Sequence, residues 1–317
     1  MHPSAALWPL GMGLALAQDR LFGEPPAWAH PVVAMGRYLG CFSRWLPSLR
    51  PAQGFLAGVA FWTVGAAISV MAAWGIETLI WQALRPWQTP ARLAASALVL
   101  GLLLKPMLAW RMLREEVAAV EIALGQSLPA GRAALARLVS RDTRELDATE
   151  VREAAIETLA ENLNDSVVAP LFWFTVAGLP GAALYRFANT ADAMWGYRGR
   201  WEWAGKWTAH ADDLLSWLPA RLTALALMCA RPRGSACWPA LAAQARRTPS
   251  PNGGWPMGAM ALQLGRRLGK PGIYSLNDAA PPPEAQDMQR AQDLARQALM
   301  MTVPALMLAA AACRGAW

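Results

Sequence analysis

The chain has few cysteines and histidines, and it lacks the common nucleotide-binding signatures. Its 317 residues contain four cysteines, none of them in a CxxC pair, and three histidines. A disulfide framework, a zinc site and an iron–sulfur cluster are therefore not expected. No GxxxxGK[ST] run and no GxSxG occur, and no GxGxxG follows a strand pattern. Nucleotide binding would need a scaffold outside the common ones.

Charge is also scarce, which indicates an integral membrane protein. Only 16% of the residues are charged and 55% are hydrophobic, whereas typical soluble domains are about 25% charged. The net charge is +7, and the basic residues lie mainly between apolar stretches, as they do in cytoplasmic loops. They do not cluster with aromatic residues as in a nucleic-acid binder. We therefore expect anionic lipid and phosphate-bearing substrates as partners, and no nucleic acid.

Long apolar stretches supply candidate membrane spans. The clearest is Phe55–Ile76, about 22 residues without a charge, enough to cross a hydrocarbon layer of ~30 Å. A second, Leu93–Trp110, is interrupted by Lys105 and Pro106. The weaker candidates are Ala5–Ala17, Val167–Tyr185, Leu214–Ala230 and Ala298–Cys313.

Two of the weaker stretches carry backbone breaks or charge. Val167–Tyr185 contains the run Gly-Leu-Pro-Gly at 178–181, and Leu214–Ala230 contains Pro219 and Arg221. Such features are tolerated at membrane depth only where they line a protein-enclosed or watered cavity. We therefore expect broken or re-entrant helices at both places.

The distribution of arginine predicts the topology. Residues 18–54, 111–166 and 231–297 are rich in arginine, whereas the link 82–92 carries only two. The positive-inside rule assigns the long loops to the cytoplasm, and 186–213 joins them if Val167–Tyr185 dips into the membrane and returns. The predicted fold is an all-α polytopic membrane protein, with about 4–6 apolar segments and one domain over 1–317. Residues 111–165 should form two or three amphipathic helices with a loop at 128–131, and 247–283 should be loop.

An acidic stripe precedes one apolar stretch. Four carboxylates recur at intervals of four, which places them on one helical face: Glu153, Glu157, Glu161 and Asp165. Stacked like charges repel by a few tenths of a kcal/mol per pair when exposed. Glu161 and Asp165, one turn apart, could converge with Asn162 on one Mg²⁺ ion. The alternative is a solvated face whose carboxylates pair with basic neighbours, namely Arg141, Arg144 and Arg152.

A second polar group lies further along the chain. Its members are Asn189, Asp192, Tyr197, Arg198, Lys206, His210, Asp212, Asp213 and Arg221. We expect Asp212 and Asp213 to open a helix, where the helix dipole favours carboxylates, and that alone could explain them. They could equally form a metal-and-phosphate cluster facing the first. Both interpretations stay open.

Two loop motifs are weaker signals taken alone. Asp19, Gly23–Pro25 and His30–Val32 are compatible with ordinary turn chemistry. The run Ser250–Pro256 could present backbone N–H groups to an anion.

Taken in order, these segments resemble the adenosylcobinamide-phosphate synthase family of cobalamin biosynthesis, the CobD/CbiB family. The resemblance covers nearly the whole chain. It rests on Asp19 with GEP at 23–25, HPV at 30–32, SRDT at 140–143, EVREAAIETLAENLNDSVVAPLFW at 150–173, NTADAMWGYR at 189–198, HADDLLSWLPARLT at 210–223 and SPNGGWPMGAMA at 250–261. The chain departs from the family pattern at Ser216, where asparagine is expected, and at Ala191, where leucine is usual.

The resemblance implies a multi-pass enzyme of the bacterial inner membrane with its active site facing the cytoplasm. Such an enzyme joins adenosylcobyric acid to (R)-1-aminopropan-2-ol or its O-phosphate through an amide bond, using ATP and Mg²⁺. The implied partners are these substrates and the lipid bilayer, and the resemblance also allows contact with other cobalamin-assembly enzymes at the membrane.

Residue chemistry then suggests roles. A carboxylate becomes an acyl donor once ATP has phosphorylated it, so the site needs Mg²⁺, cations for the phosphates and a base for the ammonium. The expected catalytic residues are Glu161, Asp165, Asp212 and Asp213. The expected metal ligands are Glu157, Glu161, Asp165 and Asp213. The expected substrate- and phosphate-binding residues are Asn162, Asn189, Asp192, Tyr197, Arg198, Lys206, Arg221, Ser250 and Asn252.

Three other functions remain open on the sequence. The chain could be a non-catalytic AmpE-like signalling or accessory protein, although the retained SRDT, ENLND and ADD runs argue against that. It could be a transporter, although its short, non-repeating spans lack the matched inverted repeats of many transporters. A prenyltransferase-like enzyme would also place acidic helices at a membrane surface.

Overall fold

The computed structural model describes residues 3–84, 90–230 and 237–314. Arg85 of the link 82–92 and residues 231–236 of the predicted loop 231–297 lie outside the described residues. The chain divides into two compact units. Unit 1 comprises Met1–Ala109, Ala169–Leu215 and Ala305–Trp317, and unit 2 comprises Trp110–Val168 and Ser216–Pro304. The single membrane domain over 1–317 stays a prediction.

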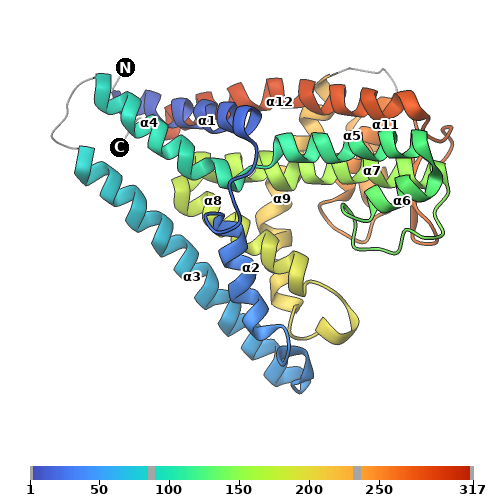
Figure 1. The fold of residues 1–317 in the computed structure, drawn as a ribbon, viewed down its shortest axis with the longest axis horizontal. Coiled ribbons are helices and arrows are strands. Elements are labelled where there is room, and N and C mark those ends of the chain that lie inside the picture. The colour runs from blue at the N-terminus through green and yellow to red at the C-terminus, as the bar shows by residue number, and fades with distance from the viewer. Residues whose placement is uncertain (1–2, 85–89, 231–236, 315–317) are drawn as a thin grey trace. The chain divides into compact units, whose positions relative to one another are not determined.

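Unit 1 is built from helices. Its elements are α1 (Pro3–Phe22), α2 (Pro31–Phe42), η1 (Leu46–Ser48), α3 (Pro51–Leu84), α4 (Pro90–Leu104), η2 (Lys105–Met107), α8 (Ala169–Trp195), η4 (Gly199–Trp201), the first part of α9 (Lys206–Ala230) and the last part of α12 (Ala285–Arg314). Helix α1 packs along α4, while α8 packs against α3 and α2 (Figure 1). A Cβ atom at Gly101 would lie 2.9 Å from the Leu14 Cβ atom and 3.1 Å from the Gly11 carbonyl oxygen. The glycine therefore lets the backbones of α1 and α4 approach closely.

The expected membrane character is confirmed. Among the described residues, five helical segments are long and apolar enough to cross a membrane: Pro51–Gln82, Pro90–Gln126, Ala148–Trp195, Lys206–Ala230 and Ala285–Cys313. They contain five of the six predicted stretches. The sixth, Ala5–Ala17, forms most of α1, which is not one of the five.

Two of the predicted interruptions are present, whereas the break predicted in Leu214–Ala230 is not found, because α9 (Lys206–Ala230) continues through Pro219 as one helix. Lys105 and Pro106 begin the 3₁₀ turn η2 between α4 and α5 (Trp110–Gln126). Inside α8, Gly178 has φ 70° and ψ −154°, outside the helical region. Only glycine adopts this conformation without strain. The predicted break at 178–181 is therefore confirmed at Gly178.

Unit 2 surrounds helix α7. Its elements are α5, α6 (Leu128–Leu135), α7 (Ala148–Leu163), the π-helical turn η3 (Asn164–Val168), the rest of α9, α10 (Trp238–Ala245), α11 (Gly254–Leu264), strands β1 (Leu268–Lys270) and β2 (Tyr274–Leu276), and most of α12 (Ala285–Arg314). The strands form one antiparallel hairpin, in which Gly269 faces Ser275. Helix α7 is packed against α5, α6, α11 and β1. Its first turn is closed by a capping box between Asp147 and Glu150.

Three further local predictions were wrong. Residues 128–131 are the start of α6 and not a loop, because the Ser127 hydroxyl caps that helix and Pro129 fits its first turn. Residues 247–283 contain α11 and the β-hairpin, since turn residues there cap elements, as Gly265 does at φ 64°. Asp212 and Asp213 do not open a helix, because α9 already begins at Lys206.

All four cysteines are exposed and none forms a disulfide: Cys41, Cys229, Cys237 and Cys313. This agrees with the expectation from their spacing.

Candidate functional site

The acidic stripe of α7 lies in the interior of unit 2 over part of its length. Glu153 is 4% exposed and Glu157 is 5% exposed. Arg141 does pair with Glu157, as the alternative of a solvated face proposed. Arg144 instead pairs with Asp142, and Arg152 pairs with Glu121. The solvated-face interpretation is therefore wrong for Glu153 and Glu157, because α5, α6, α11 and β1 cover this helix.

Glu157 has a cation and a phenol beside it. The Arg141 Nη2 atom lies 3.7 Å from the Glu157 Oε2 atom, and the Arg141 side chain is 18% exposed. Burial raises the pKa of the Tyr274 hydroxyl, and the negative charges of Glu157 and Glu161 raise it further. Tyr274 thus stays a neutral hydrogen-bond donor next to two carboxylates. A buried carboxylate needs such partners, because an isolated charge would be costly to bury.

Glu153 is paired with the β-hairpin. The Arg267 Nε and Nη2 atoms both donate to Glu153 Oε1 at 3.1 Å. A Cβ atom at Gly269 would lie 3.5 Å from Glu153 Oε2 and 2.9 Å from the Tyr274 carbonyl oxygen. The glycine therefore allows strand β1 to lie against this carboxylate.

A polar cavity of about 430 Å³ opens at this hairpin. Its charged lining residues are Glu150, Glu153, Arg267, Lys270 and Asp278, and Tyr274 also lines it. The lining therefore carries both signs of charge, which suits a small ligand with an anionic group and an ammonium. Sequence reasoning did not select Arg267 or Tyr274. The signal that could have found them is the cluster of basic and turn residues at 265–274.

Glu161 lies at the other end of α7, against the loop that precedes α11. A Cβ atom at Gly253 would lie 2.9 Å from Glu161 Oε1, so a side chain at this position would displace the carboxylate from where it now lies. The Ser250 Oγ atom accepts hydrogen bonds from the N–H groups of Asn252, at 3.2 Å, and of Gly253, at 3.0 Å. These two N–H groups therefore have a partner inside the loop, whereas the sequence suggested that they could face an anion.

Arg221 and Asn252, both predicted to bind substrate, are brought together in unit 2. The Arg221 Nη1 atom donates to Asn252 Oδ1 at 3.1 Å and to the Trp217 carbonyl oxygen at 2.6 Å. The guanidinium carbon lies 4.2 Å from the ring centre of Trp217 and 4.7 Å from that of Trp255. Two indole rings therefore hold the cation by cation–π contact.

Asp165 does not continue the α-helical stripe. It lies in the π-helical turn η3, because α7 ends at Leu163. The Asn164 Nδ2 atom donates to Asp165 Oδ1 at 2.8 Å, and the Thr223 hydroxyl donates to Asn164 Oδ1 at 3.1 Å. The prediction that Glu161 and Asp165 are one regular α-helical turn apart is therefore wrong, since a π-helical turn begins at Asn164 and is wider than an α-helical one. Such turns are frequent at functional sites.

Asn162, also a predicted site residue, lies on α7 in unit 2, where its Nδ2 atom donates to the Thr158 carbonyl oxygen at 3.1 Å. The other predicted site residues belong to unit 1: Asn189, Asp192, Tyr197, Arg198, Lys206, Asp212 and Asp213. The Arg186 Nη1 atom donates to Asn189 Oδ1 at 3.4 Å. A Cβ atom at Gly196 would collide with the Asp192 carboxylate, so this glycine makes room for it. The Lys206 ammonium lies 4.9 Å from the ring centre of Trp203.

The predicted metal ligands are therefore divided between the units, with Glu157, Glu161 and Asp165 in unit 2 and Asp213 in unit 1. Over residues 3–84, 90–230 and 237–314, no group of three or more His, Cys, Asp or Glu side chains is arranged to hold a metal ion. The available donors are carboxylate oxygens, which suit Mg²⁺ in type. With fewer than three protein ligands, the ion would also need water and phosphate oxygens, as Mg²⁺ commonly does.

The N-terminal motif forms an ion-pair network within unit 1. The Lys105 Nζ atom lies 3.3 Å from Asp19 Oδ1 and 3.0 Å from Glu24 Oε1. The other Glu24 oxygen lies 3.1 Å from His30 Nε2. The turn residues alone did not predict this network. The signal that could have predicted it is Lys105, because a lysine inside an apolar stretch usually has a charged partner.

Comparison with known proteins identifies the family. The family described as CobD/Cbib protein matches residues 12–302. The chain belongs to the CobD/CbiB family. A Thermococcus kodakarensis relative, named probable cobalamin biosynthesis protein CobD, is 39% identical over 88% of this chain and 87% of its own length. The Rhodobacter capsulatus cobalamin biosynthesis protein CobD is 37% identical over 91% of this chain and 93% of its own.

A third CobD/CbiB relative extends the match over almost the full length. The cobalamin biosynthesis protein CobD of Chromobacterium violaceum is 38% identical over 97% of this chain and 98% of its own length. No solved structure matches the chain. The motifs quoted above all fall within the matched region of the CobD/CbiB family.

Proposed function

We propose that this chain is the ATP-dependent amide ligase that joins adenosylcobyric acid to (R)-1-aminopropan-2-ol or its O-phosphate. The observation that carries the proposal is the buried carboxylate row of α7, in which Glu153 is paired with Arg267 and Glu157 lies beside Arg141 and Tyr274. Burying two carboxylates with dedicated cations is expensive for a merely structural helix face. Membership of the CobD/CbiB family supports the same function.

The chemistry requires the corrinoid carboxylate to become an acyl donor. ATP transfers its terminal phosphoryl group to a carboxylate oxygen, ADP leaves, and the amine nitrogen then attacks the acyl phosphate and displaces phosphate. The cations at the hairpin cavity, Arg267 and Lys270, would hold phosphate oxygens. The carboxylates of the same cavity would orient the ammonium before it loses its proton.

The proposed magnesium site is at the opposite end of α7. Glu161 and Asp165 would hold the ion together with water and phosphate oxygens, since no larger ligand group exists among the described residues. Bound there, magnesium would neutralise the charge of the transferring phosphoryl group. Arg221 would hold a phosphate next to it, because two indole rings and Asn252 fix its guanidinium.

The polar residues of unit 1 complete the proposal. Asp212 and Asp213 would bind the amine or a second ion, and the remaining residues would contact substrate: Asn189, Asp192, Tyr197, Arg198 and Lys206. The site would face the cytoplasm of a bacterial inner membrane, where ATP and the corrinoid are available.

The test uses purified full-length protein in lipid vesicles. ATP consumption should require a corrinoid acid and the amino alcohol or its phosphate together, and the amide product should be detected by mass spectrometry. Glu161→Gln and Asp165→Asn should abolish turnover, while the matched variant Glu145→Gln, on an exposed glutamate of unit 2, should not. Size-exclusion profiles control for folding.

Each contrary outcome would refute a different part of the proposed function. Near-normal activity in both Glu161→Gln and Asp165→Asn would remove the magnesium assignment. ATP consumption without joint stimulation would remove the ligase. Counterflow of labelled corrinoid in vesicles without ATP would favour a transporter instead.

A further inference from the structure

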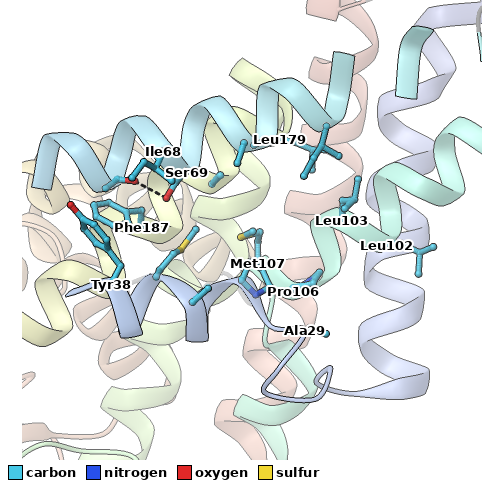
Figure 2. A pocket seen from close by; sticks show the side chains of 18 residues that line it. Ala29, Tyr38, Ile68, Ser69, Leu102, Leu103, Pro106, Met107, Leu179 and Phe187 are labelled. Carbon is cyan, nitrogen blue, oxygen red and sulfur yellow. Dashed lines mark hydrogen bonds between the residues drawn. The ribbon is translucent and has the colours of Figure 1, made fainter. Parts of the chain in front are cut away.

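Unit 1 contains an apolar cavity of about 460 Å³ that the proposed chemistry does not use. Helices α2, α3, α4 and α8 and the turn η2 all contribute to its walls. Figure 2 shows Ile68 and Ser69 of α3 on one side and Tyr38 of α2 on another, with Met107 and Pro106 of η2 to the right of both. The cavity lies within the range of about 300–1,000 Å³ typical of small-molecule sites.

The polar groups at this cavity are already satisfied by the protein. The Ser69 hydroxyl donates to the Gly65 carbonyl oxygen at 2.9 Å (Figure 2). The Tyr38 hydroxyl donates to the Phe61 carbonyl oxygen at 2.9 Å. Nearly all other lining residues are aliphatic, aromatic or proline. A buried water would need two to four polar partners and would find few here, so the cavity suits a purely apolar occupant.

The walls belong to segments that can cross a membrane. The cavity is lined by residues of α3 between 65 and 76, by Leu102 and Leu103 of α4, and by Pro106 and Met107 of η2, all of them within candidate spans. Only 17% of the most apolar 18-residue window of the α3 segment is buried inside the protein. At the cavity, Ile68 is 56% exposed, Ile76 is 42% exposed and Leu102 is 54% exposed. The medium in contact with these side chains is therefore lipid hydrocarbon.

We propose that one acyl chain of a membrane phospholipid occupies this cavity. An empty cavity would leave its walls without dispersion partners. A hydrocarbon chain that enters from the bilayer moves from one apolar environment to another, because lipid tails are as apolar as the lining itself. The bound acyl chain would pack against the side of α3 that faces the cavity, where the described side chains make few contacts. This inference is independent of the ligase proposal.

The test is photolabelling of full-length protein in phosphatidylethanolamine–phosphatidylglycerol vesicles. A trace phospholipid carries a diazirine in the middle of one acyl chain, and adducts are mapped by peptide mass spectrometry. Adducts should concentrate at cavity residues such as Ser69, Ala72 and Met107. A phospholipid with the diazirine on its head group should not label them.

A matched pair of variants separates cavity binding from general lipid contact. Ala73→Trp fills the cavity and should lose the cavity adducts, whereas Ala67→Trp, on an exposed alanine of the same helix outside the cavity, should keep them. Ala73→Leu, a smaller filling, serves if the tryptophan variant does not fold. The proposal would be overturned if the adducts were spread evenly around α3, or if the cavity of the wild-type protein carried none. In the second case another occupant, such as a second copy of the chain or a corrinoid, would fill the space.

Discussion

The backbone N–H of Leu179 donates a hydrogen bond to Glu77 Oε2 at 3.0 Å. Leu179 follows Gly178, whose non-helical conformation breaks the hydrogen-bond ladder of α8. The donor freed by this break is satisfied by a carboxylate from α3, which packs against α8. A charged side chain in a membrane-spanning helix thus has a structural partner, as intramembrane charges usually do.

Removing the acceptor should destabilise unit 1. Glu77→Leu leaves the Leu179 N–H without its bond, and an unsatisfied buried donor costs about 1–3 kcal/mol. Glu77→Gln keeps an oxygen acceptor at the same place and should be milder. Thermal unfolding in detergent compares the two variants. Equal melting temperatures for Leu and Gln would show that the bond does not stabilise the break.

Substitution of Gly178 should lower the stability of the protein. An alanine at φ 70° and ψ −154° would be strained by about 1–3 kcal/mol. The matched control is Gly75→Ala in α3, where a Cβ atom would meet no atom within 4 Å. We expect Gly178→Ala to lower the melting temperature and Gly75→Ala to leave it unchanged or raise it. A Gly178→Ala protein as stable as the wild type would show that α8 can straighten there.

Arg141 should be needed mainly because of Glu157. Arg141→Met would leave a buried carboxylate without its cation, at a cost of about 3 kcal/mol. Adding Glu157→Gln should restore stability, since the pair is then removed together. Arg144→Met is the control, because its partner Asp142 is exposed. Chemical unfolding gives the free energy of unfolding of the wild type, the two single variants and the double variant. A double variant no more stable than Arg141→Met would contradict the pairing.

The aromatic clamp on Arg221 predicts that lysine cannot replace it. Lysine lacks the planar guanidinium that lies near both indole rings and bonds to Asn252. We expect Arg221→Lys to lower kcat/KM for ATP about tenfold, equivalent to about 1.4 kcal/mol. Arg246→Lys, on an exposed arginine of the same unit, should have no effect. Steady-state ATP turnover tests this, and equal values for both variants would remove Arg221 from the site.

Tyr274 predicts a stability loss at alkaline pH. Its pKa is raised in the folded protein by burial and by the nearby carboxylates. A raised folded-state pKa gives stability that is complete below the unfolded value of about 10 and is lost as pH rises above it. The wild-type protein should therefore lose stability above about pH 10, and Tyr274→Phe should lose less. Unfolding at pH 9 and pH 11 checks the difference, and parallel losses in both proteins would contradict it.

Local features of the fold were readable from sequence, whereas long-range contacts were not. The span around Phe55–Ile76 and the break at Gly178 follow from uninterrupted apolarity and from glycine and proline, which act within a few residues. The pairing of Glu153 with Arg267 joins residues 114 apart in the chain, so no local pattern announces it. In the π-helical turn, Asn164 accepts a hydrogen bond from Thr223, which is 59 residues away in the chain. The start of α9 was misplaced because no Ser, Thr, Asp or Asn directly precedes Lys206 to mark it as the beginning of a helix.

The four cysteines are exposed and form no disulfide, so single cysteines can be used to attach fluorophores to the active protein. Serine can replace all four without breaking a covalent link, which yields a background free of thiols. Restoring Cys41 in unit 1 and Cys229 in unit 2 then provides one attachment point on each. Fluorophores at these two positions would follow the separation of the units during turnover, as ATP and corrinoid are added in sequence.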